Sequence, residues 1–262
     1  LFIVDSASVT EGETSILLVT LSMISGLEVT FSYQSVDGSA VSTQDYSAIA
    51  AATGTIPAGS LSYFIEVVTT DDVVDEVSPE SYSVSLTAAT NATVNDGSGA
   101  GDIVDNDNPP QIFISDSSAS EGGTLSFTVS ISAVSDLAVT FAYWSMDGAS
   151  SDQAVAPTDY GSVSVAMATI PAGSLTMAVP VVSVQEALFE ADEKFNVTLA
   201  SLANATAGDV SGDGIITNDD TTPQLSVFDL SMTEGDTGFF VVSLSAVSAL
   251  DAVFDWRTYD GT

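Results

Sequence analysis

The sequence predicts an all-β protein, built from tandem immunoglobulin-like Greek-key β-sandwiches of about seven strands each and arranged as a rod. Three observations predict this fold class: short segments of alternating apolar and polar residues, the lack of any long helical periodicity, and an internal repeat of domain length. Of the 262 residues 45% are hydrophobic, so each unit can bury a core.

Alternation with a period of two marks the predicted strands. Residues 125–131 alternate strictly between apolar residues and Ser or Thr, and residues 29–33 and 195–199 show the same pattern. This period places one face of a strand in the core and the other in water. About seven such segments per unit, separated by turns rich in Gly, Pro and Asp, are typical of a β-sandwich.

The internal repeat sets the domain organisation. The dipeptide Glu-Gly occurs at residues 11–12, 121–122 and 234–235, with spacings of 110 and 113 residues. The hexapeptide Thr-Ile-Pro-Ala-Gly-Ser at residues 55–60 recurs unchanged at 169–174. A period near 110 residues is too long for a solenoid turn, so each repeat is expected to be a whole domain.

These repeats predict complete sandwiches over residues 1–108 and 109–221, followed by the first part of a third over 222–262. Proline occurs at both joints, at 109–110 and at 223. Because proline stiffens a short linker, we expect a semi-rigid rod rather than loosely tethered domains.

The third repeat is expected to be incomplete. Residues 225–228, 239–244 and 252–259 supply about three strands, which are too few to close a sandwich. Their apolar faces and free edges need cover. We expect either that the natural chain continues past Thr262 or that a neighbouring copy completes the fold by strand addition.

The charge balance excludes several partners. The chain carries 36 Asp and Glu against two basic residues, Lys194 and Arg257, for a net charge of −34. Nucleic acid and anionic membrane surfaces need clustered cations, so neither is expected as a partner. No apolar run approaches the ~20 residues of a membrane-spanning helix, so membrane insertion is not expected.

The residue types argue against an enzyme. There is no His and no Cys, which removes the commonest general base and thiol chemistry. Two carboxylates can hydrolyse a glycoside, but a metal site explains the recurring carboxylates better. We therefore predict that the chain is not an enzyme.

Carboxylates recur at the ends of predicted strands in each repeat. Any single Asp there is ordinary turn chemistry, whereas the recurring set favours a shared cation. Without a cation the set would repel itself, by about 4 kcal/mol for two charges 4 Å apart at an effective dielectric constant of 20. Ca²⁺ suits such a set because it takes six to eight oxygen ligands in irregular geometry, whereas Mg²⁺ prefers octahedral, water-rich sites.

The ordered set of motifs in the first repeat resembles the Calx-beta domain family. The motifs are Thr10-Glu11-Gly12, Asp37-Gly38 with Asp45-Tyr46, Ile56-Pro57-Ala58-Gly59, Asp71-Asp72 with Glu76 and Glu80-Ser81-Tyr82, and Ile103-Val104-Asp105-Asn106-Asp107. The resemblance implies a seven-stranded immunoglobulin-like sandwich that binds Ca²⁺. Members of this family occur in sodium–calcium exchangers, in an integrin subunit and in long bacterial surface proteins.

The resemblance also implies the ligands. In the first repeat the candidates are Glu11, Asp45, Asp71, Asp72, Glu76, Asp105 and Asp107, with Glu80 less firmly implied. In the second repeat they are Glu121, Asp159, Glu186, Glu190, Asp219 and Asp220, with Glu193 also available. Because Gln185-Glu186 stands in place of Asp71-Asp72, we expect fewer ions or lower affinity in the second repeat.

Function follows from these expectations. We expect a structural segment of an extracellular or cell-surface fibre or adhesin, with Ca²⁺-rigidified repeats, and like subunits or neighbouring repeats as partners. A Ca²⁺-dependent module that recognises a protein or glycan, and a Ca²⁺ sensor, remain alternatives. Asn91 and Asn204 head glycosylation sequons in matching loops, so glycan decoration is expected there.

Overall fold

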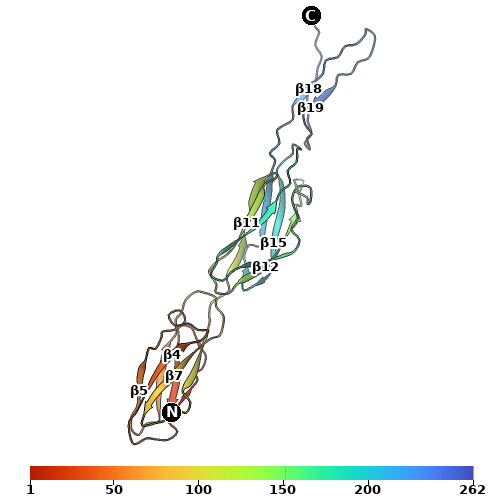
Figure 1. Cartoon of the computed structure of the whole chain (residues 1–262). Helices are drawn as coiled ribbons and strands as arrows, with labels where there is room; N and C mark the ends of the chain where they lie inside the picture. The colour runs from red at the N-terminus through yellow and green to blue at the C-terminus, as the bar shows by residue number, and fades with distance from the viewer. Residues whose placement is uncertain (151, 262) are drawn as a thin grey trace. The chain divides into compact units, whose positions relative to one another are not determined.

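The structure is a computed structural model that describes every residue except 151 and 262. The chain divides into two compact units. The first comprises Leu1–Pro109 with Val134–Leu137, and the second comprises Pro110–Ala133 with the chain from Ala138 onward. Within the described residues all regular elements are β-strands, so the predicted all-β sandwich class is confirmed (Figure 1).

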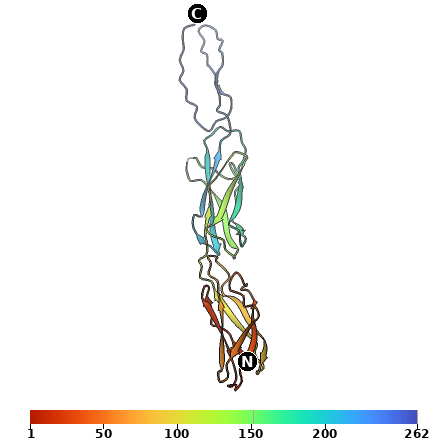
Figure 2. The same cartoon turned by 90° about the vertical axis from the view of Figure 1, so that its left-hand side faces the viewer.

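The first unit is a sandwich of two sheets, one with strand order β1-β3-β6 and one with order β2-β8-β7-β4-β5 (Figures 1 and 2). β1 and β2 are successive parts of the first strand and lie in opposite sheets, so together they complete the seven expected strands. The bounds are β1 (Phe2–Val4), β2 (Val9–Thr10), β3 (Thr14–Thr20), β4 (Val29–Asp37), β5 (Ala52–Ile56), β6 (Ser62–Val68), β7 (Glu80–Thr90) and β8 (Ser98–Val104).

The second unit repeats this topology with sheets β14-β11-β9-β16 and β10-β17-β15-β12-β13. In both units the second part of the first strand pairs in parallel with the last strand, β2 with β8 and β10 with β17. The bounds are β9 (Gln111–Ile114), β10 (Ser117–Ser120), β11 (Thr124–Ile131), β12 (Val139–Asp147), β13 (Ala166–Ile170), β14 (Thr176–Val182), β15 (Glu193–Ala203), β16 (Thr206–Ala207) and β17 (Ser211–Thr217).

Each core lies between its two sheets and includes apolar residues of the alternating segments, such as Phe31 and Phe195. In the first unit Phe31 and Tyr82 are buried, and each lies over a glycine on the neighbouring strand. A Cβ atom at Gly54 would lie 2.3 Å from the Phe31 ring, and one at Gly101 would lie 2.4 Å from the Tyr82 ring. These glycines therefore give the rings the space that they occupy.

The repeated hexapeptide is a structural turn. It leaves β5 in the first unit and β13 in the second, and in each it closes with a bond from a Ser amide to a Pro carbonyl oxygen, Ser60 to Pro57 and Ser174 to Pro171, both at 3.0 Å. The intervening Gly59 and Gly173 have φ angles of 84° and 73°, in the left-handed region that favours glycine.

The residues after 222 form little regular structure. β18 (Leu225–Val227) and β19 (Val242–Leu244) pair antiparallel. The prediction of a third strand at residues 252–259 is wrong, because the structure forms no strand there. In the described part of the chain, no neighbouring strand accepts the backbone hydrogen bonds of these residues. The described chain contains no helix of the length and apolarity needed to cross a membrane.

Candidate metal centre

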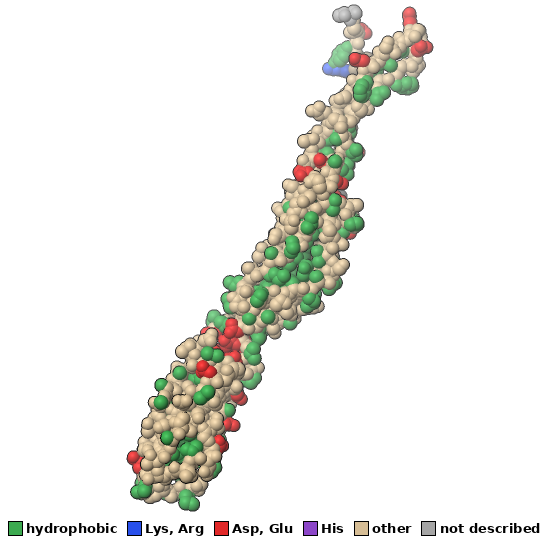
Figure 3. Space-filling view, in the orientation of Figure 1, with side chains coloured by type: hydrophobic (Ala, Val, Ile, Leu, Met, Phe, Trp, Pro, Cys, Tyr) green, Lys and Arg blue, Asp and Glu red, His purple; other side chains and the backbone are tan. Residues whose placement is uncertain are grey.

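Acidic side chains gather at one end of the first unit (Figure 3). The parallel pair β2 and β8 brings them together, because Thr10 lies opposite Val104 and both strands end there. Glu11 follows β2 directly and Asp105 follows β8 directly. Loops after β4 and β6 and the start of β7 reach the same end, so five chain segments contribute carboxylates to it.

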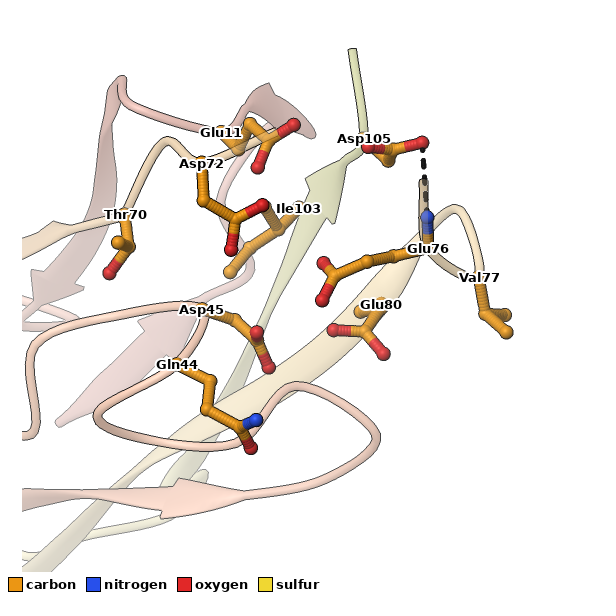
Figure 4. Close-up of a pocket in the computed structure, with 10 residues that line it drawn as sticks. All are labelled: Glu11, Gln44, Asp45, Thr70, Asp72, Glu76, Val77, Glu80, Ile103 and Asp105. Atoms are coloured by element: carbon orange, nitrogen blue, oxygen red, sulfur yellow. Dashed lines mark hydrogen bonds between the residues drawn. The ribbon is translucent and has the colours of Figure 1, made fainter. Parts of the chain in front are cut away.

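Two groups of three carboxylates form within this cluster. Glu11, Asp72 and Asp107 form one group, and Asp45, Glu76 and Glu80 form the other. Within each group, one carboxylate oxygen per residue lies within 4.8 Å of the others. Figure 4 shows Asp45, Glu76 and Glu80 pointing toward one another, with Glu11 and Asp72 beside them. Glu80, which the sequence implied less firmly, thus lies within the cluster.

Asp71 and Asp105 lie outside both groups and make hydrogen bonds that hold the loops in place. The Asn106 side-chain amide donates to Asp71 Oδ1 at 3.3 Å. The backbone amides of Glu76 and Asp107 donate to the two oxygens of Asp105, at 3.5 and 3.2 Å. Asp105 also lines the pocket in Figure 4, where the dashed line marks its bond from Glu76. Five of the seven implied ligands, together with Glu80, therefore make up the two groups.

The recurring Glu-Gly dipeptide has a physical explanation at this site. Gly12 has a φ of 77° and Gly122 a φ of 70°, both in the left-handed region. A Cβ atom on Gly12 would lie 2.8 Å from Cβ of Asp71, and one on Gly122 would lie 3.0 Å from Cβ of Gln185. Glycine therefore turns the chain after the buried glutamate and leaves room for the acidic loop.

A buried carboxylate oxygen without a hydrogen-bond donor indicates that the first cluster fits a cation. Glu11 is only 7% exposed. Its Oε1 accepts a hydrogen bond from the Asn106 backbone amide at 3.0 Å. Asp107 Oδ2 is buried and has no donor in the structure. A buried carboxylate oxygen without a donor is costly, and a bound Ca²⁺ would supply the missing positive charge to such hard oxygens.

The raised pKa values of these carboxyl groups also fit a cation site. Burial raises the pKa of Glu76 and of Glu80 to about 7, and the nearby Asp45 charge adds to both shifts. Burial also raises the pKa of Glu11 and Asp107 above their ordinary values. Each shift reports first a carboxylate that is partly withdrawn from water, and second one that lies near other carboxylates.

The second unit contains a related cluster. Glu121 is 7% exposed, and its Oε2 has no donor. Buried oxygens of Glu193 and Asp220 also lack donors. Burial raises the pKa of Glu190 to about 7, with the Glu186 charge next, and that of Glu193 to about 8, with the Asp159 charge next. Among the described residues, however, both close groups of three carboxylates lie in the first unit.

Both units contain a hydrogen bond between a side-chain amide and a carboxylate at equivalent positions, but the amide and the carboxylate have swapped places. In the second unit Gln185 Nε2 donates to Asp219 Oδ1 at 3.0 Å, whereas in the first the amide is on Asn106 and the carboxylate is Asp71. The Gln185 replacement is therefore matched by a carboxylate gained at position 219. Among the implied ligands, the charge that the second unit lacks is that of Asp105, because Asn218 takes its place and accepts the same two backbone bonds.

The two sequon asparagines occupy matching left-handed turns. Asn91 follows β7 with a φ of 61°, and Asn204 follows β15 with a φ of 58°. Their side-chain amides donate to backbone carbonyl oxygens, Asn91 to Glu28 at 2.8 Å and Asn204 to Ala138 at 2.9 Å. Both side chains are exposed, and their glycosylation stays a prediction.

Two such sandwiches in one chain, each with clustered carboxylates where its strands end, define an acidic tandem β-sandwich protein. A model of the Calx-beta domain matches residues 2–107 and again residues 105–221. The chain therefore belongs to the Calx-beta family, whose tandem domains are calcium-binding modules rather than enzymes. A search of curated protein sequences finds no match.

Solved structures with similarity to this chain include calcium-binding domains. CBD12 from CALX1.2 is 14% identical with a TM-score of 0.38, and the match covers 82% of this chain and 99% of that one. The apo form of the Calx CBD1 domain is 17% identical with a TM-score of 0.39, and the match covers 43% and 100%. These scores are too low to carry an argument, so the family assignment rests on the domain model.

Proposed function

We propose that this chain binds Ca²⁺ through the carboxylate clusters of its sandwich repeats, and that it is a structural segment of an extracellular or cell-surface fibre or adhesin. The convergence of Glu11, Asp45, Asp72, Glu76, Glu80 and Asp107 on one end of the first unit carries the Ca²⁺ proposal. Buried oxygens without donors in both units support it. Ca²⁺ holds loops from separate strands together and so stabilises the folded state.

Calorimetric titration of the metal-free chain with Ca²⁺ tests this proposal, with Mg²⁺ as the comparison ion. We expect saturable Ca²⁺ binding that is tighter than Mg²⁺ binding, because the donors are numerous carboxylates in an irregular arrangement. The proposal is contradicted if the titration shows no heat of Ca²⁺ binding and the melting temperature is the same in Ca²⁺ and in EDTA.

The fibre role rests on the tandem organisation and on the joints. Proline at residues 109–110 and 223 stiffens short linkers, and Ca²⁺ bound to loops at the ends of the repeats restrains them further. Extracellular fluids supply enough Ca²⁺ to fill sites of modest affinity. Small-angle scattering tests this role: EDTA should broaden the distribution of chain dimensions, and identical curves with and without Ca²⁺ contradict it.

The segment after residue 222 supports like subunits or neighbouring repeats as partners. Three large apolar side chains of this segment are mostly exposed: Phe239 at 80%, Val253 at 92% and Trp256 at 82%. Among the described residues of the segment, the regular structure consists of β18 and β19. We propose that β-structure from a like subunit or a further repeat covers these side chains. A concentration series in analytical ultracentrifugation tests association between chains, with a monomer at every concentration as the contradicting result.

A further inference from the structure

A pair of residues behind the cluster recurs in both units without belonging to it. In the first unit the Tyr46 hydroxyl donates to Asp37 Oδ1 at 2.6 Å. In the second unit the Tyr160 hydroxyl donates to Asp147 Oδ1 at 2.8 Å. Asp37 and Asp147 are the last residues of β4 and β12, and each tyrosine directly follows a candidate ligand, Asp45 or Asp159.

Asp37 ties both ends of the loop that carries Asp45. Besides the Tyr46 hydroxyl, it accepts bonds from the Ser42 backbone amide at 2.9 Å and from the Ser42 hydroxyl at 3.3 Å. Ser42 precedes Asp45 and Tyr46 follows it, so one carboxylate fixes the chain on both sides of the ligand. Consistent with this, the Tyr46 hydrogen bond and then the Ser42 bonds lower the pKa of Asp37.

The tyrosine ring anchors the same loop to the rigid sheet. Tyr46 is 1% exposed and stacks on Tyr82 of β7, with ring centroids 4.7 Å apart. Tyr160 is equally buried and stacks on Phe195 of β15 at 4.2 Å. Each ring is therefore held at its face by a central strand and at its hydroxyl by the aspartate.

The glycine after each aspartate allows this arrangement. A Cβ atom at Gly38 would lie 2.3 Å from the Ser81 carbonyl oxygen, and one at Gly148 would lie 2.2 Å from the Lys194 carbonyl oxygen. Only glycine lets the loop leave the strand so close to β7 or β15. The Asp-Gly and Asp-Tyr motifs therefore form one structural unit, although they lie 8 to 12 residues apart in the sequence.

Asp45 itself is held by three hydrogen bonds. The Asp45 backbone amide donates to the Val41 carbonyl oxygen, and the Asp45 carbonyl oxygen accepts from the Thr70 amide at 2.9 Å. Asp45 Oδ2 accepts from the Val41 amide. With these groups engaged, Asp45 still reaches Glu76 and Glu80 (Figure 4). Asp159 repeats the pattern with Val155 and the Val184 amide.

We propose that Asp37 with Tyr46, and Asp147 with Tyr160, are positioning residues that hold Asp45 and Asp159 at the Ca²⁺ site without touching the ion. This proposal rests on the Ca²⁺ binding proposed above. The clamp supplies a preorganised ligand loop, so its loss weakens Ca²⁺ binding while the other ligands stay in place.

The test uses Tyr46→Phe, which removes the hydroxyl and keeps the stacked ring. Tyr82→Phe is the matched control, because the Tyr82 hydroxyl has no hydrogen-bond partner and phenylalanine stands at the equivalent position 195. We expect Tyr46→Phe to weaken Ca²⁺ binding by about tenfold at unchanged stoichiometry, as for loss of a partner that orients a ligand. Tyr82→Phe should leave the Ca²⁺ isotherm of the full chain unchanged.

A double-mutant comparison separates positioning from plain structural support. In the Asp45→Asn background, Tyr46→Phe should have little further effect on Ca²⁺ affinity, because it acts through Asp45. Wild-type affinity in Tyr46→Phe, with only a lower melting temperature in EDTA, overturns the inference while Ca²⁺ binding by the wild type stands. A lower Ca²⁺ stoichiometry in Asp37→Asn also overturns it, because a residue that does not touch the ion changes the affinity and not the number of ions bound. Lack of Ca²⁺ binding by the wild type overturns the proposed function instead.

Discussion

The two complete repeats share a fold and differ at their acidic ends. Both bury a glutamate after the split first strand, Glu11 or Glu121, and both hold an aspartate beside a clamped tyrosine. Only the first unit brings three carboxylates within 4.8 Å of one another among the described residues. A sandwich can therefore keep the scaffold of a cation site while its charge density changes, because the loops carry the ligands and the sheets carry the stability.

Among the ligands implied for the first unit, the two units differ in charge at two positions. Asn218 replaces Asp105 and keeps its two backbone hydrogen bonds, so geometry is retained and a charge is lost. Gln185 replaces Asp71, but its amide pairs with Asp219, so that change moves a charge instead of removing one. We therefore expect the first unit to bind Ca²⁺ more tightly than the second.

Removal of Ca²⁺ should have the largest effect. Each ion stabilises its unit by about 2.7 kcal/mol when free Ca²⁺ is 100 times its dissociation constant. We expect EDTA to increase hydrogen exchange in loops around Asp72 and Glu76 more than around Glu186 and Glu190, as measured by peptide-resolved mass spectrometry in the full chain. Equal increases in the two units would contradict tighter Ca²⁺ binding in the first unit.

Neutralising a ligand should give the next largest effect. Asp72→Asn removes one member of a three-carboxylate group, and Glu186→Gln is the matched change in the second unit. We expect Asp72→Asn to weaken the tighter class of Ca²⁺ sites by about 10- to 100-fold, which is 1.4 to 2.7 kcal/mol. Glu186→Gln should affect only the weaker class. Calorimetry on both variants checks this, and a loss of tight sites in Glu186→Gln reverses the assignment.

Acid should weaken Ca²⁺ binding, because protons and Ca²⁺ compete for the same carboxylates. The pKa values of Glu76 and Glu80 are raised to about 7, so Ca²⁺ affinity in the first unit should fall by roughly tenfold per pH unit below pH 7 if one proton is displaced. Glu193, with its pKa raised to about 8, should shift this dependence higher in the second unit. Titrations between pH 5.5 and 8.5, a range chosen around these values, measure both.

The metal-free protein should show the opposite trend in stability. Between pH 4.5 and 7 the folded state keeps protons on Glu76 and Glu80 that the unfolded chain has released. This stabilising contribution is complete below the ordinary pKa of 4.5 and is lost as the pH rises through 7. In EDTA we therefore expect stability to decrease from pH 5 to pH 8, as measured by urea unfolding. An increase over that range would contradict burial of these carboxyls.

Restoring the missing charge should give the smallest effect. Asn218→Asp places a carboxylate where Asp105 stands in the first unit and leaves the acceptor for the Glu190 and Asp220 amides. We expect roughly fivefold tighter Ca²⁺ binding in the second unit, which is about 1 kcal/mol. Gln185→Asp is the contrasting variant, since it removes the amide that pairs with Asp219 and adds repulsion. If Gln185→Asp gives the greater gain, the position 218 explanation is wrong.

The fold class could be predicted from the sequence alone. Alternation at residues 125–131 and 29–33 predicted strands that the structure contains as parts of β11 and β4, because burial on one face imposes that period wherever the strand lies. The prediction of a strand at residues 252–259 was wrong because no neighbouring strand pairs with it in the described chain. A strand needs a neighbour to accept its hydrogen bonds, and apolar pattern alone does not supply one.

Which of the implied ligands lie close together follows from the tertiary structure and could not be predicted from the sequence. The sequence marked Asp71 and Asp105 as equal to Asp72, yet the structure gives them hydrogen bonds to loop amides while Asp72 joins a three-carboxylate group. It also brought Glu80 into the cluster and set Asp37 behind the ligand loop. These placements depend on distances between side chains from five separate segments, and a sequence pattern carries residue types and spacings but no such distances.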